Sequence, residues 1–313
     1  MWTLSDGRGV GLADAVHGSA QEPVIVLFAL LTQLGDVWFL FVLCGVYYIA
    51  GEEFPRWGIE RRRGLFVFGL LLTYIALIGV LKQFFVLPRP PGASSPPGLE
   101  WIPLVARGVV ADMATATGYG FPSGHALGSA LVWGGFALVV GRDRRSRARF
   151  ALAGVVIAVV SLARLVLGVH YLVDVVAGGI IGLLALGALY RIAAGGTEPT
   201  RVLVVAAGIG TLGLGYGLTF ESVAAVGSGV GAWLVWRAVA VTTPASPSGR
   251  REVAAALVVF GLAGSLFALL YALEPPLSAT FFGAVVAAGG VVGAPLLGER
   301  LVERTGTPPT NAL

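Results

Sequence analysis

Residues 163–174, ARLVLGVHYLVD, place an arginine, a histidine and an aspartate within an otherwise apolar stretch. An ionisable side chain in or at the edge of a membrane span is costly unless it is paired or hydrated, so such residues are usually functional. His170 and Asp174 are spaced to lie on one face of a helix. The carboxylate is then expected to accept one imidazole N–H, which leaves the other ring nitrogen available as a base or a nucleophile.

The composition around this stretch is that of an integral membrane protein. Hydrophobic residues make up 56% of the 313 residues and charged residues only 12%, and the mean hydropathy is +0.85. These values lie outside the usual range of soluble domains. The net charge of +4 does not indicate a nucleic-acid partner, because the basic residues form short clusters between apolar runs, as membrane orientation requires. The single cysteine, Cys44, cannot form an intramolecular disulfide.

The apolar runs predict an all-α, polytopic membrane bundle of about nine transmembrane helices, since a helix needs about 20 residues to cross the hydrocarbon core. Gln33 and Asp36 interrupt the first run, where they either mark an interfacial turn or help to line a site. Gly168 is taken as the break between the fourth and fifth spans. The expected spans are residues 23–50, 64–87, 122–141, 150–168, 170–190, 201–220, 222–242, 252–273 and 277–297.

The basic residues orient these nine spans. Most arginines follow the odd-numbered spans, which the positive-inside rule makes cytoplasmic, together with the C-terminus. The opposite side keeps few basic residues, and three of them, Lys82, Arg89 and Arg164, lie at the ends of spans. The sequence therefore predicts a cell-membrane protein whose conspicuous polar residues converge on the extracytoplasmic face.

Two further stretches belong to this group. Residues 82–90, KQFFVLPRP, place Lys82 and Arg89 on the same helical face if the helix runs that far, and the prolines then end it. Residues 121–125, FPSGH, supply the hydroxyl of Ser123, the flexible Gly124 and a second histidine, His125, where a new apolar run begins. Between these two stretches lies a long loop, residues 88–121, which is expected to lie in the interface and cover the site.

In chain order the three stretches read K-x6-RP, PSGH and R-x5-H-x3-D, and this pattern resembles the type 2 phosphatidic acid phosphatase superfamily. That superfamily also contains soluble acid phosphatases and vanadium haloperoxidases. The resemblance implies that His170 attacks phosphorus to form a phosphohistidine and that Asp174 orients and charges its imidazole. It also implies that His125 protonates the leaving alkoxide and then activates water.

The remaining motif residues suit the binding of phosphate oxygens. Lys82, Arg89 and Arg164 are cations, and arginine binds phosphate in a bidentate manner. Ser123 and the backbone N–H of Gly124 add donors at an expected helix start. The reaction is expected to need no metal or other cofactor. Zinc is not expected either, because only two candidate histidines are present and these cations would repel a divalent ion. The superfamily usually has serine where this chain has Ala163, and Ser161 would point to a different side of the helix.

These observations predict an integral membrane phosphatase, acting on a lipid phosphate such as a polyprenyl diphosphate, phosphatidic acid or phosphatidylglycerol phosphate. A lipid phosphotransferase would use the same site. A lipid-binding or transport protein would instead work through the C-terminal spans. The haloperoxidase reading, which would place vanadate in the same anion pocket, is disfavoured by the expected spans. The oligomeric state is left open.

The chain is expected to divide into a catalytic core, residues 1–192, and additional C-terminal transmembrane helices, residues 193–313. In this second part, small residues recur four apart at Gly213 and Gly217 and again at Gly227 and Gly231, which is typical of closely packed membrane helices. The third histidine, His17, lies in a polar N-terminal segment and is expected to be an ordinary exposed residue.

Overall fold

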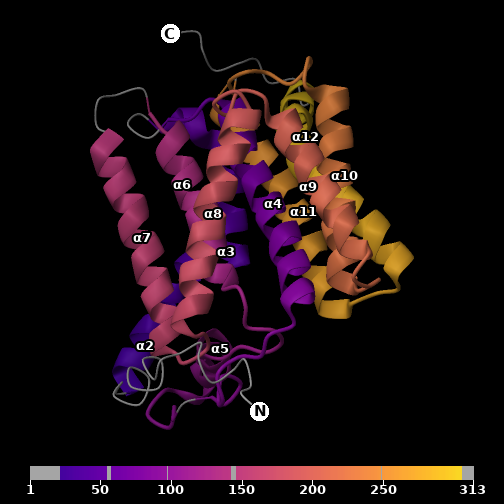
Figure 1. Ribbon diagram of the computed structural model, residues 1–313. Coiled ribbons are helices and arrows are strands. Elements are labelled where there is room, and N and C mark those ends of the chain that lie inside the picture. The colour runs from indigo at the N-terminus through magenta and orange to yellow at the C-terminus, as the bar shows by residue number, and fades with distance from the viewer. Residues whose placement is uncertain (1–21, 55–57, 97, 142–145, 248, 305–313) are drawn as a thin grey trace. The chain divides into compact units, whose positions relative to one another are not determined.

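The computed structural model describes residues 22–54, 58–96, 98–141, 146–247 and 249–304, and within these ranges the chain forms helices and no strand (Figure 1). The all-α prediction is therefore confirmed. The helices, in chain order, are α2 (Glu22–Leu31), η1 (Thr32–Gly35), α3 (Val37–Ala50), η2 (Gly51–Glu53), α4 (Arg61–Phe85), α5 (Leu104–Ala114), α6 (Gly124–Val139), α7 (Ser146–Val166), α8 (Leu172–Ile192), α9 (Pro199–Leu214), α10 (Phe220–Val239), α11 (Arg250–Leu273) and α12 (Leu277–Arg304).

Several of these helices are apolar and long, as in a membrane protein, but the count of nine spans is not confirmed. Six helices among the described residues are long and apolar enough to cross a membrane. A seventh span results if the bent pair Glu22–Gly35 and Val37–Glu53, at 44° to each other, counts as one. The expected spans 122–141 and 201–220 contain shorter helices, α6 and α9. Pro122 precedes the first, and Gly141 and Gly215 follow the two helices, so turn-forming residues occupy the ends of both runs.

Contacts along the chain separate two compact units. The described residues within 1–40, 81–137 and 144–187 form unit 1, and those within 41–80, 138–143 and 188–313 form unit 2. All eight predicted site residues belong to unit 1. The division into a catalytic core and additional C-terminal helices concerns function and stays a prediction.

Glycines bring the helix backbones of unit 1 into direct contact. A Cβ atom on Gly178 of α8 would lie 2.5 Å from the carbonyl oxygen of Ser123, and one on Gly182 would lie 2.7 Å from that of Leu127. The N-terminal halves of α6 and α8 are therefore packed backbone to backbone. In the same unit, α2 packs against α5 and α7 (Figure 1). The segment between Pro88 and Phe121 thus contains a helix, α5, where the sequence predicted only a loop.

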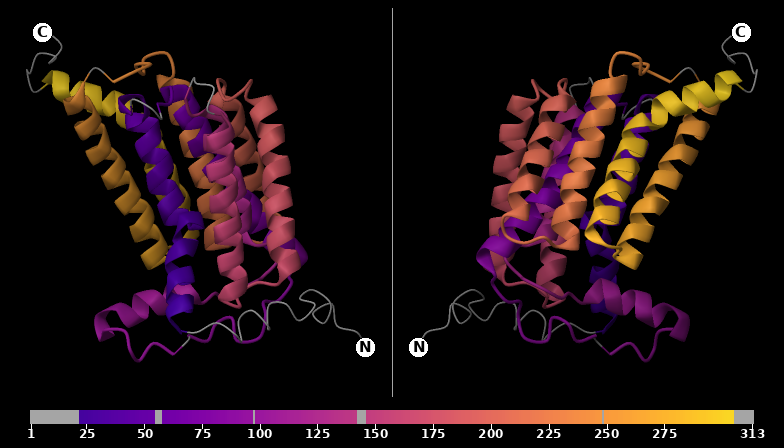
Figure 2. Two further views of the ribbon diagram at one scale, coloured as in Figure 1. Left: turned by 90° about the vertical axis from the view of Figure 1, so that its left-hand side faces the viewer. Right: turned by 90° about the vertical axis from the view of Figure 1, so that its right-hand side faces the viewer.

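Unit 2 contains the closest packing of the C-terminal helices. Gly227 and Gly231 of α10 lie against the backbone of α12, since a Cβ on Gly227 would be 2.6 Å from the Phe281 carbonyl oxygen and one on Gly231 would overlap Val285. The predicted packing role of this pair is confirmed. The prediction that Gly213 and Gly217 form a second such pair on one helix was wrong, because α9 ends at Leu214, before Gly217. Figure 2 shows α12 beside α11 and changing direction towards its C-terminal end, and Pro295 inside α12 accounts for such a bend.

A buried ion pair also ties the helices of unit 2 together. Arg61 and Glu252 are 3% and 1% exposed, and their Nη2 and Oε1 atoms are 3.2 Å apart. Arg61 also donates through Nη1 to the Pro244 carbonyl oxygen at 2.6 Å. Removing one partner of such a pair is costly, because the other charge stays buried without its ionic partner. The ion pair therefore favours this packing of α4 against α11.

The close packing of α10 on α12 predicts opposite effects for two glycine-to-alanine changes. Gly231→Ala should lower the melting temperature of the detergent-solubilised protein, because overpacking typically costs about 1–3 kcal/mol. Gly261→Ala in α11 is the matched control: nothing lies within 4 Å of its added Cβ. That change should leave the melting temperature unchanged or raise it, since alanine favours helix over glycine. Equal melting temperatures for the two variants would contradict this packing.

Candidate active site

The third motif folds as the end of one helix, a short connection and the start of the next. Arg164 lies in the last turn of α7, His170 lies in the connection, and Asp174 lies in the first turn of α8. Gly168 adopts a φ of 67°, which favours glycine, and its N–H donates to the Leu165 carbonyl oxygen at 3.0 Å. The predicted break at Gly168 is confirmed, and this turn aims His170 back toward the helix ends of unit 1.

His170 lies between a carboxylate and a guanidinium. Its Nδ1 is 3.5 Å from Oδ2 of Asp174, and the two side chains are 2% and 0% exposed. The same carboxylate oxygen accepts a hydrogen bond from the Tyr171 N–H at 3.0 Å. At 3.5 Å the two atoms are close but not hydrogen-bonded, and Nδ1 has no hydrogen-bond partner among the described residues. The predicted hydrogen bond is therefore not present in this structure.

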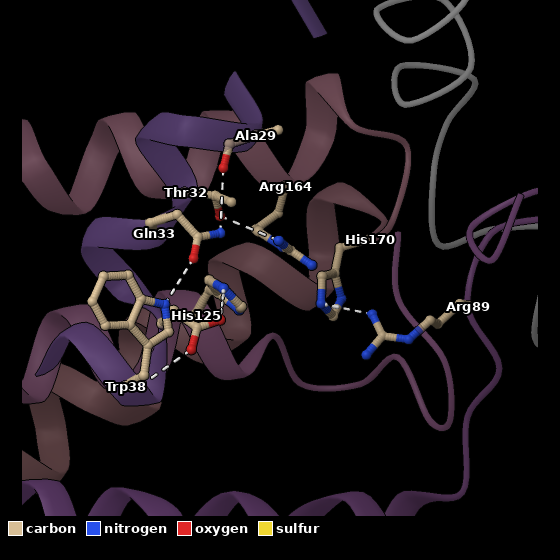
Figure 3. A network of polar contacts seen from close by, with 9 residues as sticks. Ala29, Thr32, Gln33, Trp38, Arg89, His125, Arg164 and His170 are labelled. Carbon is tan, nitrogen blue, oxygen red and sulfur yellow. Dashed lines mark hydrogen bonds and ion pairs between the residues drawn. The ribbon is translucent and has the colours of Figure 1, made fainter. Parts of the chain in front are cut away.

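The other ring nitrogen faces Arg89. Nη1 of Arg89 lies 2.9 Å from Nε2 of His170 (Figure 3). Because a guanidinium can only donate, Nε2 must accept, and the ring proton of the neutral imidazole lies on Nδ1, toward Asp174. The Nε2 lone pair therefore points into the cationic part of the site.

Burial and charge both favour the neutral form of His170. Burial lowers its pKa well below the usual value, and the positive charges of Arg89, Arg164 and Lys82 lower it further. Burial also lowers the pKa of Arg89 to about 10, a shift that the Asp174 carboxylate opposes. At neutral pH the arginine therefore keeps its charge while the histidine next to it keeps its lone pair.

Arg89 is held by backbone carbonyls from two segments. Its Nε donates to the Thr117 carbonyl oxygen and its Nη1 to that of Val169, both at 2.9 Å. The approach of Gly120 to Arg89 leaves little room for a side chain, since a Cβ on Gly120 would lie 3.2 Å from the arginine Cα. The first and third motifs are therefore joined directly by one guanidinium. Lys82 lies in the last turn of α4 and acts on the same site by its charge.

The second motif begins α6 beside the start of α8. The Ser123 N–H donates to the Asp174 carbonyl oxygen at 2.9 Å, and Gly124 is the first residue of α6. Ser123 is fully buried, and its Oγ has no hydrogen-bond partner among the described residues. Helix N-termini carry unsatisfied N–H groups that attract anions. The hydroxyl and the helix start together form a donor set suited to phosphate oxygens.

The structure adds two residues from the broken first helix. Oδ2 of Asp36 lies 3.5 Å from Nε2 of His125. Thr32 is completely buried, and its Oγ1 lies 3.2 Å from Nη1 of Arg164. A threonine hydroxyl therefore contacts the arginine that follows the unusual Ala163, which is itself fully buried. The sequence singled out Asp36 as a charged residue inside an apolar run, whereas nothing in the sequence distinguished Thr32.

All predicted site residues therefore lie in one unit, although their roles remain predictions. Direct contacts join Arg89, His170, Asp174 and the backbone of Ser123. Lys82 and Arg164 are connected to His170 by their charges. The arrangement combines a buried neutral imidazole, three cations and a second histidine beside its own carboxylate. These groups are suited to nucleophilic attack on a phosphate ester and to the binding of its negative oxygens.

Comparison with known proteins relates the chain to phosphatases. Phosphatidylglycerophosphatase B of Bacillus subtilis is 32% identical over 90 residues, which is 27% of this chain and 44% of that protein. Sphingosine-1-phosphate phosphatase 2 of Mus musculus is 29% identical over 187 residues, which is 56% of this chain and 46% of that protein. The chain thus spans less than half the length of either relative. A comparison with solved structures gives no significant match.

The family comparison covers the segment that carries the site. Residues 63–197 match the model of the PAP2 superfamily, and this range includes all three motifs. The resemblance predicted from those motifs is confirmed over residues 63–197, which are less than half of the 313 residues.

Proposed function

We propose that the protein is a membrane lipid phosphatase that works without a metal through a phosphohistidine on His170. The observation that carries this proposal is the arrangement of His170, with Nδ1 facing Asp174 and Nε2 facing Arg89. A nucleophile needs a lone pair directed at phosphorus, and an arginine next to that lone pair can bind the phosphate oxygens and bring phosphorus to it. The names of the two relatives support a lipid phosphate as the substrate.

In the first step, Nε2 of His170 attacks phosphorus and the bond from phosphorus to the ester oxygen breaks. The imidazolium of His125 gives its proton to the leaving alkoxide, which departs as an alcohol. In the second step, the neutral His125 takes a proton from water and the oxygen attacks the phosphohistidine. The bond between phosphorus and nitrogen breaks, inorganic phosphate leaves, and both histidines regain their starting protonation states.

The cations and donors hold the phosphate during both steps. Arg89, Arg164 and Lys82 neutralise the negative oxygens, whose charge has to be held within a buried site. The Ser123 hydroxyl and the first N–H groups of α6 add hydrogen bonds. Asp174 stabilises the charge that develops on the His170 ring when Nε2 forms its bond to phosphorus.

The substrate enters at the extracytoplasmic face of the cell membrane in this proposal, with the C-terminus on the cytoplasmic side. The distribution of arginine between apolar runs supports this orientation. Polyprenyl diphosphate, phosphatidic acid and phosphatidylglycerol phosphate are the candidate substrates. A lipid headgroup suits a site at the ends of apolar helices, because the acyl or prenyl chains can remain in the bilayer.

Loss of the nucleophile should abolish the reaction. The full-length protein in detergent, with excess EDTA, is expected to release phosphate from at least one of the three candidate lipids, and His170→Ala should lower kcat/KM by at least about 1,000-fold. The control is His17→Ala, a change in the segment outside the described residues, which should leave the rate unchanged. Well-folded protein that releases no phosphate from any of the lipids would contradict the proposal and favour phosphoryl transfer or transport.

The depressed pKa of His170 predicts how activity depends on pH. Since the neutral imidazole is the nucleophile, lowering the pH should protonate His170 and reduce kcat/KM only well below its usual pKa of 6.5. Arg89→Gln removes one positive charge, so it should move this acidic limb to higher pH in addition to weakening substrate binding. The measurement is kcat/KM against pH for both proteins.

A second arginine in the same unit provides the control for this pH experiment. Arg107 donates to the carbonyl oxygens of Ile102 and Glu100, and Arg107→Gln should leave the acidic limb where the wild-type protein has it. An acidic limb that keeps its position in Arg89→Gln would show that the Arg89 charge does not act on the nucleophile.

A further inference from the structure

The break in the first helix brings polar groups to the second histidine. Asp36 is the one residue between η1 and α3, where the chain bends by 44°. Gly35 makes this approach possible, since a Cβ there would lie 2.6 Å from both Ser129 Oγ of α6 and Val160 Cγ1 of α7. The turn is therefore wedged between the two helices that carry His125 and Arg164.

Hydrogen bonds on the far side of the carboxylate hold Asp36 in place. Its Oδ1 accepts from the backbone N–H of Trp38 at 3.3 Å. The indole Nε1 of Trp38 donates to Oε1 of Gln33 at 2.9 Å, and Nε2 of Gln33 donates to the Ala29 carbonyl oxygen at 3.3 Å (Figure 3). These contacts leave Oδ2 directed at His125 Nε2, 3.5 Å away. The carboxylate is thus oriented by its neighbours.

We propose that Asp36 is a positioning residue that holds and charges His125, so that this histidine enters the reaction as the acid. The inference rests on the proposed function. Asp36 would keep a proton on Nε2 of His125, and Nδ1 would then carry the proton that passes to the leaving oxygen. The carboxylate is needed because burial disfavours an imidazolium at His125, and the positive charges of Arg164 and Lys82 disfavour it further.

The two histidine–carboxylate pairs of the site differ in burial, which separates their roles. Nitrogen and oxygen are 3.5 Å apart in both. The His170 and Asp174 side chains are 2% and 0% exposed, whereas those of His125 and Asp36 are 20% and 34% exposed. A buried imidazole stays neutral and suits a nucleophile. The side chain of His125 is partly exposed, but its Nε2 atom is buried beside Asp36. The carboxylate therefore has to offset the cost of charging the ring, while the partial exposure lets the side chain exchange protons with water, as an acid must.

The test compares two leaving groups in the same protein preparation. The substrates are dioctanoyl phosphatidic acid, whose alkoxide needs a proton to leave, and a nitrophenyl phosphate carrying an octyl chain, whose phenolate does not. Asp36→Asn keeps the size of the side chain and an oxygen for the Trp38 N–H. It should lower kcat/KM for the phosphatidic acid by about 10- to 100-fold, part of the usual contribution of a general acid, and that for the aryl ester by less than about threefold.

A pH profile and four further variants complete the test. Removing the carboxylate charge should move the alkaline limb of kcat/KM for phosphatidic acid to lower pH, because His125 then loses its proton more readily. His125→Gln should show the same dependence on the leaving group, with no further loss in the double variant. Asp36→Glu should restore most of the wild-type ratio between the two substrates. The control Asp112→Asn, on α5, should change neither kcat/KM for the two substrates nor the position of the alkaline limb.

The ratio of the two rates does not depend on the folded fraction, so the outcome is clear even for a poorly stable variant. If Asp36→Asn lowered kcat/KM equally for both substrates, the role of Asp36 would be purely structural. If both values stayed at the wild-type level, Asp36 would have no role in the reaction. Either result overturns the inference. Failure of the proposed function would look different: the wild-type protein would hydrolyse neither substrate, or His170→Ala would retain activity.

Discussion

The guanidinium of Arg89 and the imidazole of His170 face each other at 2.9 Å, although both carry positive charge when protonated. This contact requires a neutral histidine with its lone pair on Nε2, and it thereby places the ring proton on the side of Asp174. In the proposed mechanism, the direction of attack, the role of the Asp174 carboxylate and the chemistry available at neutral pH all depend on this choice of tautomer. Burial supports the same choice, because it lowers the pKa of His170 well below its usual value.

Backbone contacts make the charge arrangement possible. The carbonyl oxygens of Thr117 and Val169 bind Arg89, and the Asp174 carbonyl oxygen binds the Ser123 N–H. Gly178 permits the approach of α8 to α6 that this last bond requires. Main-chain groups cannot adopt alternative rotamers, so they hold the site more firmly than side-chain contacts would. Such preorganisation matters because an electrostatic site is effective only when it needs little rearrangement during the reaction.

The broken first helix has a chemical consequence as well as a structural one. A continuous helix through residues 32–36 would satisfy its own backbone and direct its side chains along regular positions. The turn instead presents Thr32 to Arg164 and Asp36 to His125. The cost of interrupting a helix within an apolar segment is thus offset by polar contacts at the site.

The sequence by itself determined the features that depend on short-range order. The helical class follows from long apolar runs, and the sharing of one site by Arg164, His170 and Asp174 follows from their spacing and the turn at Gly168. The count of nine spans was less secure, because apolar runs predict helices better than they predict where turns shorten them, as in α6 and α9. Tertiary structure alone decided the contacts of Asp36 and Thr32. Those contacts depend on the packing of η1 against α6 and α7, and on a glycine that admits the close approach. Pairing between segments far apart in the chain leaves no periodic signal in either segment, and so only the folded arrangement reveals it.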